Sequence, residues 1–152
     1  MKKIGLDTNF FMAIFQAEAD KIDSSAKIME MIANGDLIAI VSTITLIEVA
    51  TLFCQRQEPE KAKKAVALVT SLPNTIYVDV TKEMSFVSAE LKVSEKLSIA
   101  DAIILSAAIE LSADVFLTFD SDFDRVARIK CITPDEFLRI RGVDIESFCR
   151  LG

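Results

Sequence analysis

The sequence predicts a three-layer α/β fold, in which a mostly parallel sheet of about five strands lies between helices. Short runs rich in Ile, Val, Leu and Phe alternate along the chain with longer segments of helical pattern. The short runs contain few polar residues, as parallel strands buried on both faces do. With 152 residues, 51% of them hydrophobic, the chain suits one compact domain, and we expect residues 1–152 to form it.

Five runs are expected to form the strands. The first four are dense in β-branched and aromatic residues, and the last is shorter and weaker. They are KIGL at 3–6, LIAIVS at 37–42, IYVDV at 76–80, DVFLTF at 114–119 and KCIT at 130–133. Since helical segments separate most of them, each strand is expected to join the next by a crossover, which makes neighbouring strands parallel.

Helical patterns fill the segments between these strands. A first helix follows the first strand, and further helices are expected at 24–35, 44–57, 58–72, 82–96 and 99–112. Their ends carry recognisable signals: Asn-Gly closes the helix at 24–35, and Ser98 opens the one at 99–112. Beyond the last strand, Phe137, Leu138 and Phe148 suggest an additional packed helix, and we assign residues 138–152 to a C-terminal helical extension.

Composition excludes several classes of function. The 17 Lys and Arg against 23 Asp and Glu give a net charge of -6, which argues against a broad cationic face for nucleic acid or membranes. The chain contains no His, so a Ser-His-Asp or Cys-His mechanism and His-ligated zinc are excluded. Its three cysteines are widely spaced, and no signal peptide or long apolar run is present. We therefore expect a reduced, cytoplasmic protein without a membrane segment.

Acidic residues follow the predicted strands at their carboxyl ends, where open parallel sheets bind ligands. Asp7 follows the first strand, and Glu48 lies in the helix after the second. Asp120 and Asp122 follow the fourth strand, and Asp101 lies near the start of an apolar helix. These side chains are therefore expected to meet at one end of the sheet.

Each aspartate also has a purely structural interpretation. Asp7 suits a helix N-cap, and Asp101 stands three residues after Ser98 in an approximate capping box. Asp120 and Asp122 suit a turn that caps the following segment. The aspartates taken singly are thus compatible with an ordinary structural role.

Glu48 is harder to explain structurally, because it lies in the apolar stretch TITLIEVATLF, and we expect little of the helix that carries it to be exposed to solvent. The helical neighbours at i±3 and i±4 are Ile44, Thr45, Thr51 and Leu52, so no Lys or Arg lies within reach on the same helix. Burying an unpaired carboxylate costs several kcal/mol. Its partner must come from elsewhere in the fold, either as a distant Arg or as a metal ion.

A divalent cation is the economical partner for clustered carboxylates. Two carboxylates about 4 Å apart repel by on the order of 4 kcal/mol at an effective dielectric constant of 20. Oxygen ligands without His or Cys favour Mg²⁺ or Mn²⁺ over zinc. Such an ion would also supply the positive potential that an acidic protein lacks, and it could activate water for phosphodiester hydrolysis.

Four short motifs in order resemble the PIN-domain ribonucleases, most closely the small prokaryotic group that includes VapC-type toxins. They are DTN after the first strand, STITLIE at 42–48, SIADAIILSAA at 98–108 and LTFDSDF at 117–123. The resemblance extends over nearly the whole chain, from Lys2 to about Phe137.

This resemblance implies a parallel sheet of about five strands and Mg²⁺- or Mn²⁺-dependent cleavage of RNA. It implies homodimers and, for a toxin, an antitoxin partner. The four acids that the family uses as metal ligands fall on Asp7, Glu48, Asp101 and Asp120, with Asp122 as the alternative to Asp120. Asn9 and Thr118 match the polar residues that support them.

Other functions remain open at this stage. The chain is longer than a minimal VapC, so a PIN nuclease of RNA processing that is not a toxin is one alternative. A phosphoryl-transfer or receiver domain is a second, although DTNFF lacks the Asp-x-Asp of the phosphatases. A catalytically silent binding module, with the aspartates as caps and Glu48 paired with an Arg, is the third.

Overall fold

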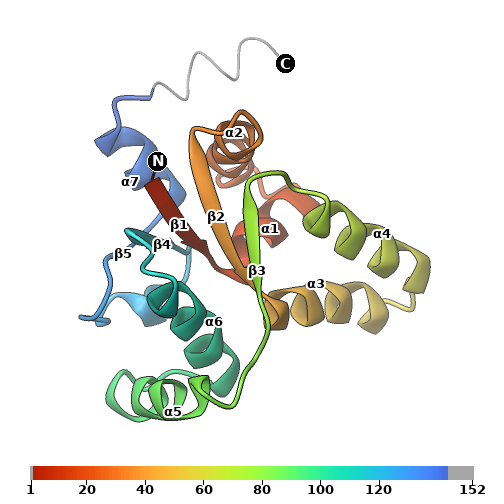
Figure 1. The fold of residues 1–152 in the computed structure, drawn as a ribbon. Helices are drawn as coiled ribbons and strands as arrows, with labels where there is room; N and C mark the ends of the chain where they lie inside the picture. The colour runs from red at the N-terminus through yellow and green to blue at the C-terminus, as the bar shows by residue number, and fades with distance from the viewer. Residues whose placement is uncertain (1, 144–152) are drawn as a thin grey trace.

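The computed structural model describes residues 2–143 and contains one five-stranded sheet with helices on both faces (Figure 1). The strands are β1 (Lys2–Leu6), β2 (Leu37–Ser42), β3 (Thr75–Val78), β4 (Val115–Leu117) and β5 (Cys131–Ile132). Their order is β3-β2-β1-β4-β5, and all four pairings are parallel. The predicted α/β fold is confirmed, and each expected strand is present with ends that differ by at most two residues.

The strand order places a topological switch between the central strand β1 and its neighbour β4. From β1 the chain moves outward to β2 and β3, then returns across the sheet to β4 and β5. Ile4 pairs with Val115 and Leu6 with Leu117, so β1 and β4 end at the same level. In doubly wound sheets the carboxyl ends of the strands on either side of such a switch form the usual ligand site.

Helices cover both faces of the sheet, and most of them start at a residue that caps the first turn. The long helices are α1 (Thr8–Phe15), α2 (Ile22–Ala33), α3 (Thr43–Gln55), α4 (Pro59–Thr70), α5 (Met84–Ser94) and α6 (Ile99–Glu110). A single 3₁₀ turn, η1 (Ser121–Phe123), and the short helix α7 (Pro134–Ile140) complete the described residues. Ser98 caps α6 as expected, since its Oγ accepts a hydrogen bond from the amide of Asp101 at 3.1 Å.

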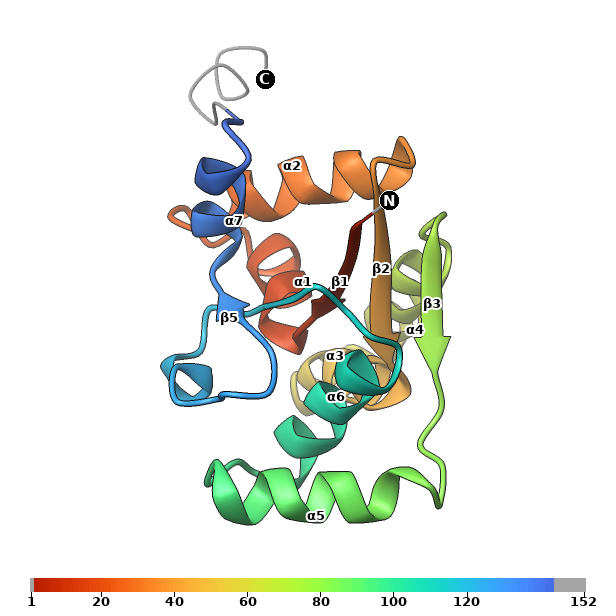
Figure 2. The ribbon, with the colours of Figure 1, turned by 60° about the vertical axis from the view of Figure 1, so that its left-hand side comes forward.

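The sheet separates two apolar cores because successive residues of a strand face opposite sides. Ile4, Leu6 and Leu117 pack with α1 to α4 and α7, whereas Phe116 packs with α5 and α6. In Figure 2, α5 lies beyond α6 on the side away from the sheet. In the same view β1, β2 and β3 run downward, and α3 and α6 lie at their lower, carboxyl ends. These two helices are thus placed to bring side chains to that edge.

Gly5 allows α6 to lie close against the centre of the sheet. A Cβ at this position would lie 2.6 Å from Cβ of Ala108 and 2.8 Å from Cδ2 of Phe116, both closer than side-chain atoms approach. The close approach of α6 to β1 depends on this glycine, and α6 carries Asp101 at its first turn.

The aromatic residues of α1 belong mainly to the core. Phe10 and Phe11 are fully buried, and Phe15 is half-buried with its ring edge-on to that of Phe53, 6.0 Å between centroids. Phe137 and Leu138 are buried in α7, which starts before the extension expected from residue 138. Phe148, like the rest of 144–152, lies outside the described residues. No helix among the residues described is long and apolar enough to cross a membrane.

Candidate functional site

Asp7 is placed at the end of β1, where it caps α1. Its Oδ1 accepts the amide hydrogen of Thr8 at 2.8 Å, and its Oδ2 accepts the hydroxyl hydrogen of Thr118 at 2.7 Å. The side chain is buried, with only 4% of the residue exposed. A carboxylate in this position is held rigidly, and burial makes its charge costly.

Thr118 links the ends of β1 and β4 through one hydroxyl group. Besides donating to Asp7, its Oγ1 accepts from the side-chain amide of Asn9 at 3.2 Å and from the backbone amide of Asp120 at 3.0 Å. Asn9 in turn accepts the amide hydrogen of Phe119 at 3.1 Å. The two polar residues named from the sequence thus form one network that fixes the loop after β4 against the start of α1.

Glu48 reaches the same edge of the sheet from α3. Its Oε1 accepts the hydroxyl hydrogen of Thr8 at 2.6 Å, and Thr8 directly follows Asp7. The expectation that α3 is hardly solvated is wrong: Ile47 is 60% exposed and Thr51 is exposed, while Glu48 itself is half-buried. The partner does come from elsewhere in the fold, but it is a neutral hydroxyl group.

Asp101 and Asp120 complete the group from two further elements. Asp101 lies in the first turn of α6 and is half-buried. Asp120 is also half-buried and caps η1, its Oδ1 accepting the amide hydrogen of Asp122 at 2.9 Å. Asp122 is exposed in the first turn of η1, and Asp124, just after this turn, is also exposed.

The electrostatic effects among these acids show that they share one region. Burial raises the pKa of Asp7 to about 7, although the hydrogen bond from Thr118 lowers it, and the charges of Asp101 and Glu48 raise it further. Burial likewise raises the pKa of Asp101, with added repulsion from Glu48, Asp120 and Asp122. Repulsion thus acts between acids carried by β1, α3, α6 and the loop after β4.

The structural interpretations of the single aspartates are correct but incomplete. Asp7 and Asp120 are N-caps, and Asp101 stands in the capped first turn of α6. Within residues 2–143, none of the salt bridges involves Glu48 or any of these aspartates. The distant Arg proposed as partner for Glu48 is therefore not found among the described residues. Helix capping explains why each aspartate stands where it does. It supplies no positive charge to balance the acids that gather there.

The donor atoms suit a hard divalent cation. They are carboxylate and hydroxyl oxygens, the ligand type that Mg²⁺ and Mn²⁺ prefer. Cys131 interacts with the charge of Asp7, but burial raises the pKa of this thiol to about 12, so it offers no thiolate to a softer metal. Within the described part of the chain, no three acidic or cysteine side chains already converge as a ready-made metal site. Mg²⁺ binds through few carboxylates and retains several waters, so the acids need not all contact it directly.

Sequence reasoning missed Thr8. It stands inside the Asp-Thr-Asn stretch, but its partner Glu48 is 40 residues away, and its hydroxyl also lies 3.4 Å from that of Thr45. The hint in the sequence is a hydroxyl residue directly after an N-cap acid at a strand end. Only the packing of α1 against α3 reveals which acid it contacts.

The fold and these residues define an α/β protein with an acidic cluster at the switch point of a parallel sheet. A family model described as the PIN domain matches residues 4–129, a range that contains all the acids of the cluster. The chain therefore belongs to the PIN domain family. A comparison with curated proteins gives no match.

Solved structures confirm the fold. VapBC2 from Rickettsia felis, bound to a DNA fragment from its promoter, is 20% identical with a TM-score of 0.69, covering 88% of this chain and 98% of that one. A toxin-antitoxin complex from Klebsiella pneumoniae is 19% identical with a TM-score of 0.60, covering 88% and 98%. VapC20 from Mycobacterium tuberculosis, a sarcin-ricin loop cleaving toxin, is 18% identical with a TM-score of 0.65, covering 85% and 99%.

Proposed function

We propose that the chain is a metal-dependent endoribonuclease with Asp7, Glu48, Asp101 and Asp120 as its metal-binding acids. The observation that carries this proposal is the mutual repulsion of acids from four segments at the switch point, where no described Lys or Arg balances them. Membership in the PIN family supports nuclease chemistry at the same place. The likeness to a sarcin-ricin loop cleaving toxin supports RNA as the substrate.

The residues have distinct roles in this proposal. Asp7 is the fixed ligand, because Thr8 and Thr118 hold both of its oxygens in place. Glu48, Asp101 and Asp120 are less buried and complete the site from three other elements, with Asp122 as an alternative to Asp120. Bound Mg²⁺ or Mn²⁺ would supply a Lewis acid and a water of lowered pKa. The chain itself contributes placement and negative charge, and no His is needed as a base.

The nuclease proposal is tested by incubating a mixed RNA pool with wild type and Asp101→Asn, with Mn²⁺ or with EDTA. Wild type is expected to cut the pool only with Mn²⁺, and Asp101→Asn to lose at least a hundredfold in rate. Asp124→Asn is the matched control, because Asp124 is an exposed acid near the cluster. Cleavage by wild type in EDTA, or full activity of Asp101→Asn, would overturn the proposal.

We further propose that the nuclease is the toxin of a toxin-antitoxin pair. The support is the likeness to chains of VapBC2 and of a toxin-antitoxin complex. The structure offers an apolar hollow of about 340 Å³ between α1, α2 and α4 to a partner protein, with Leu68 61% exposed at its rim. Induced expression of wild type is expected to arrest growth, and Asp7→Asn to permit it. Normal growth under wild type would favour an RNA-processing nuclease instead.

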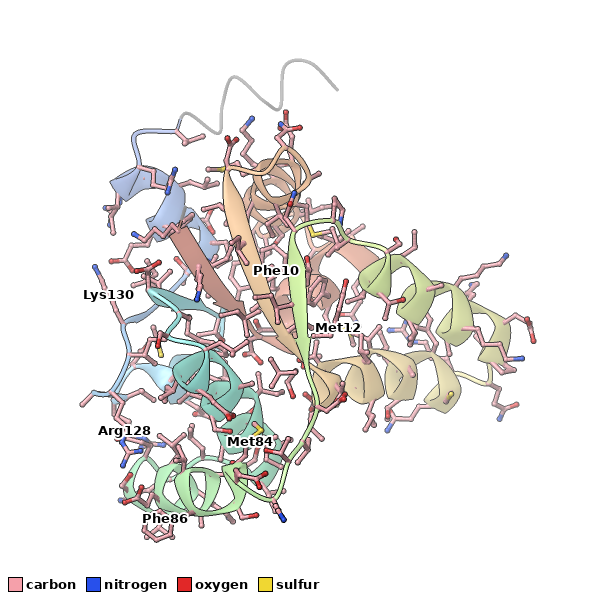
Figure 3. All side chains as sticks on the ribbon, viewed as in Figure 1. Phe10, Met12, Met84, Phe86, Arg128 and Lys130 are labelled. Atoms are coloured by element: carbon pink, nitrogen blue, oxygen red, sulfur yellow. The ribbon has the colours of Figure 1, made fainter. Side chains whose placement is uncertain are left out.

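A homodimer is the assembly that we propose. Phe86 and Val93 are 73% and 79% exposed on α5, and Figure 3 shows Phe86 projecting outward from this helix. Such side chains are commonly buried by association. Light scattering is expected to give twice the mass of 16.8 kDa. A monomeric mass at micromolar concentration would contradict this assembly.

A further inference from the structure

A second hollow, of about 250 Å³, adjoins the acidic cluster on the side of α3. It is lined by side chains from α1 and α3: Thr8, Met12, Glu48, Thr51, Leu52 and Gln55. The α3 residues stand at i, i+3, i+4 and i+7 from Glu48, so they form one continuous face of that helix. Met12 is labelled in Figure 3, close to the first turns of α3. The hollow therefore begins at Glu48 and extends along the helix away from the cluster.

Most hydrogen bonds that the lining groups can donate are already in use. The hydroxyl of Thr8 donates to Glu48 at 2.6 Å, and that of Thr51 donates to the carbonyl of Ile47 at 2.7 Å. The side chain of Gln55 is exposed and makes no hydrogen bond to another described residue, so its amide offers both a donor and an acceptor. Met12 and Leu52 are half-buried and supply apolar surface beside it. A ligand here would meet an apolar wall and one uncommitted amide.

Charge and size restrict what the hollow can hold. Glu48 stands at one end and no Lys or Arg lines the hollow, so a phosphate group would be repelled there. The volume is below the roughly 300 to 1,000 Å³ typical of pockets for drug-sized ligands, so the occupant must be small. Gln55 is seven residues from Glu48, which places it about 10 Å further along the helix axis. An uncharged planar group with hydrogen-bonding edges meets these restrictions on charge, on volume and on the distance between Glu48 and Gln55.

We propose that this hollow is the subsite for one RNA base next to the cleaved phosphodiester, and that Gln55 selects the base through its amide. The inference rests on the proposed nuclease function and adds a determinant of sequence preference to it. An amide can pair with a base edge through two hydrogen bonds at once, which discriminates between bases. Met12 and Leu52 contact the base face, and the acids hold the neighbouring phosphate through the metal.

Binding is tested separately from cleavage with ¹⁵N-labelled Asp7→Asn protein in Mg²⁺. This variant keeps an N-cap residue at the start of α1 and is not expected to cut RNA. Four homopolymeric trinucleotides are titrated in turn, and the side-chain amide resonances of Gln55 are followed by NMR. One base is expected to shift them saturably and more than the other three do. Shifts confined to backbone amides around the acids, with Gln55 unmoved, would overturn the subsite.

Selectivity is tested by sequencing the ends that wild type, Gln55→Leu and Cys54→Ala produce from a randomised RNA pool. Gln55→Leu keeps the side-chain size and is expected to reduce discrimination at one nucleotide position about tenfold. Cys54→Ala is the control, because Cys54 is an exposed neighbour on α3 outside the hollow. An unchanged profile for Gln55→Leu would overturn the subsite and leave the nuclease standing. Shifted Gln55 resonances without cleavage by wild type would overturn the nuclease but support base binding at Gln55.

Discussion

The hydroxyl group of Thr118 donates a 2.7 Å hydrogen bond to the carboxylate of Asp7 and thereby joins the ends of β4 and β1. The bond lies at the switch point of the sheet, and it lowers the pKa of the buried carboxylate more than the hydrogen bond from the Thr8 amide does. It compensates in part for the burial of Asp7 and for the charges of the neighbouring acids. The contact between Thr118 and Asp7 therefore affects both the stability of the fold and the charge state of the Asp7 carboxylate at the site.

Thr118→Val should destabilise the protein by about 1 to 3 kcal/mol, because Asp7, Asn9 and the amide of Asp120 each lose a partner. The loss should be larger at pH 8 than at pH 5, because a charged carboxylate needs the donor more than a protonated one. Denaturant unfolding at the two pH values measures both effects. Thr70→Val is the control, since the exposed Thr70 bonds only to its own helix. Equal losses at both pH values would contradict this role.

Without metal, Asp7 should make the protein less stable as the pH rises. Its pKa is raised from 3.8 to about 7 in the folded state, so between these values the folded protein holds a proton that the unfolded chain has released. Stability should fall from about pH 4 to about pH 7 and then level off, by on the order of 4 kcal/mol from this group. Asp7→Asn in EDTA should therefore be more stable than wild type at pH 8, with the gap closing toward pH 4.

Unfolding curves for wild type, Asp7→Asn and Asp124→Asn across this pH range test the assignment. Asp124 is exposed, so its substitution should leave the pH dependence of wild type intact. If Asp7→Asn is less stable than wild type at pH 8, the charged carboxylate of Asp7 does not lower the stability of the folded protein.

Thr8→Val should weaken metal binding without removing a ligand. Thr8 donates to Glu48 at 2.6 Å, and groups that orient metal ligands commonly change metal affinity by about 10- to 100-fold. The Mn²⁺ concentration that gives half of the full rise in melting temperature should increase by about that factor. If this midpoint is the same in Thr8→Val and in wild type, Thr8 does not orient Glu48 for metal.

Gly5→Ala should destabilise the fold by about 1 to 3 kcal/mol, because its Cβ would lie 2.6 Å from that of Ala108. Adding Ala108→Gly should recover part of the loss, since it removes one of the two clashing atoms. A double-mutant cycle by denaturant unfolding measures this coupling. Strictly additive effects would indicate that β1 and α6 are not in close contact here.

Much of the site was predictable because a parallel sheet brings the residues after its strands to one edge. Asp7 directly follows β1 and Asp120 stands three residues after β4, so their positions depend mainly on the strands being recognised. The same rule does not reach Thr8, because its contact with Glu48 depends on how α1 and α3 are rotated against each other. The hollow that ends at Gln55 also depends on how α1 and α3 pack, because residues of both helices line it. Solvation of α3 was misjudged because an apolar sequence does not reveal which residues the other helices leave uncovered.

The most direct test of the account is a Mn²⁺ titration of wild type, Glu48→Gln and Asp124→Asn. Melting temperature and cleavage of a mixed RNA pool are followed in the same samples. Wild type and Asp124→Asn should show a saturable rise in melting temperature and cut RNA, while folded Glu48→Gln should show neither. If Glu48→Gln responds to Mn²⁺ and cuts RNA as wild type does, the acidic cluster is not the metal-binding catalytic site.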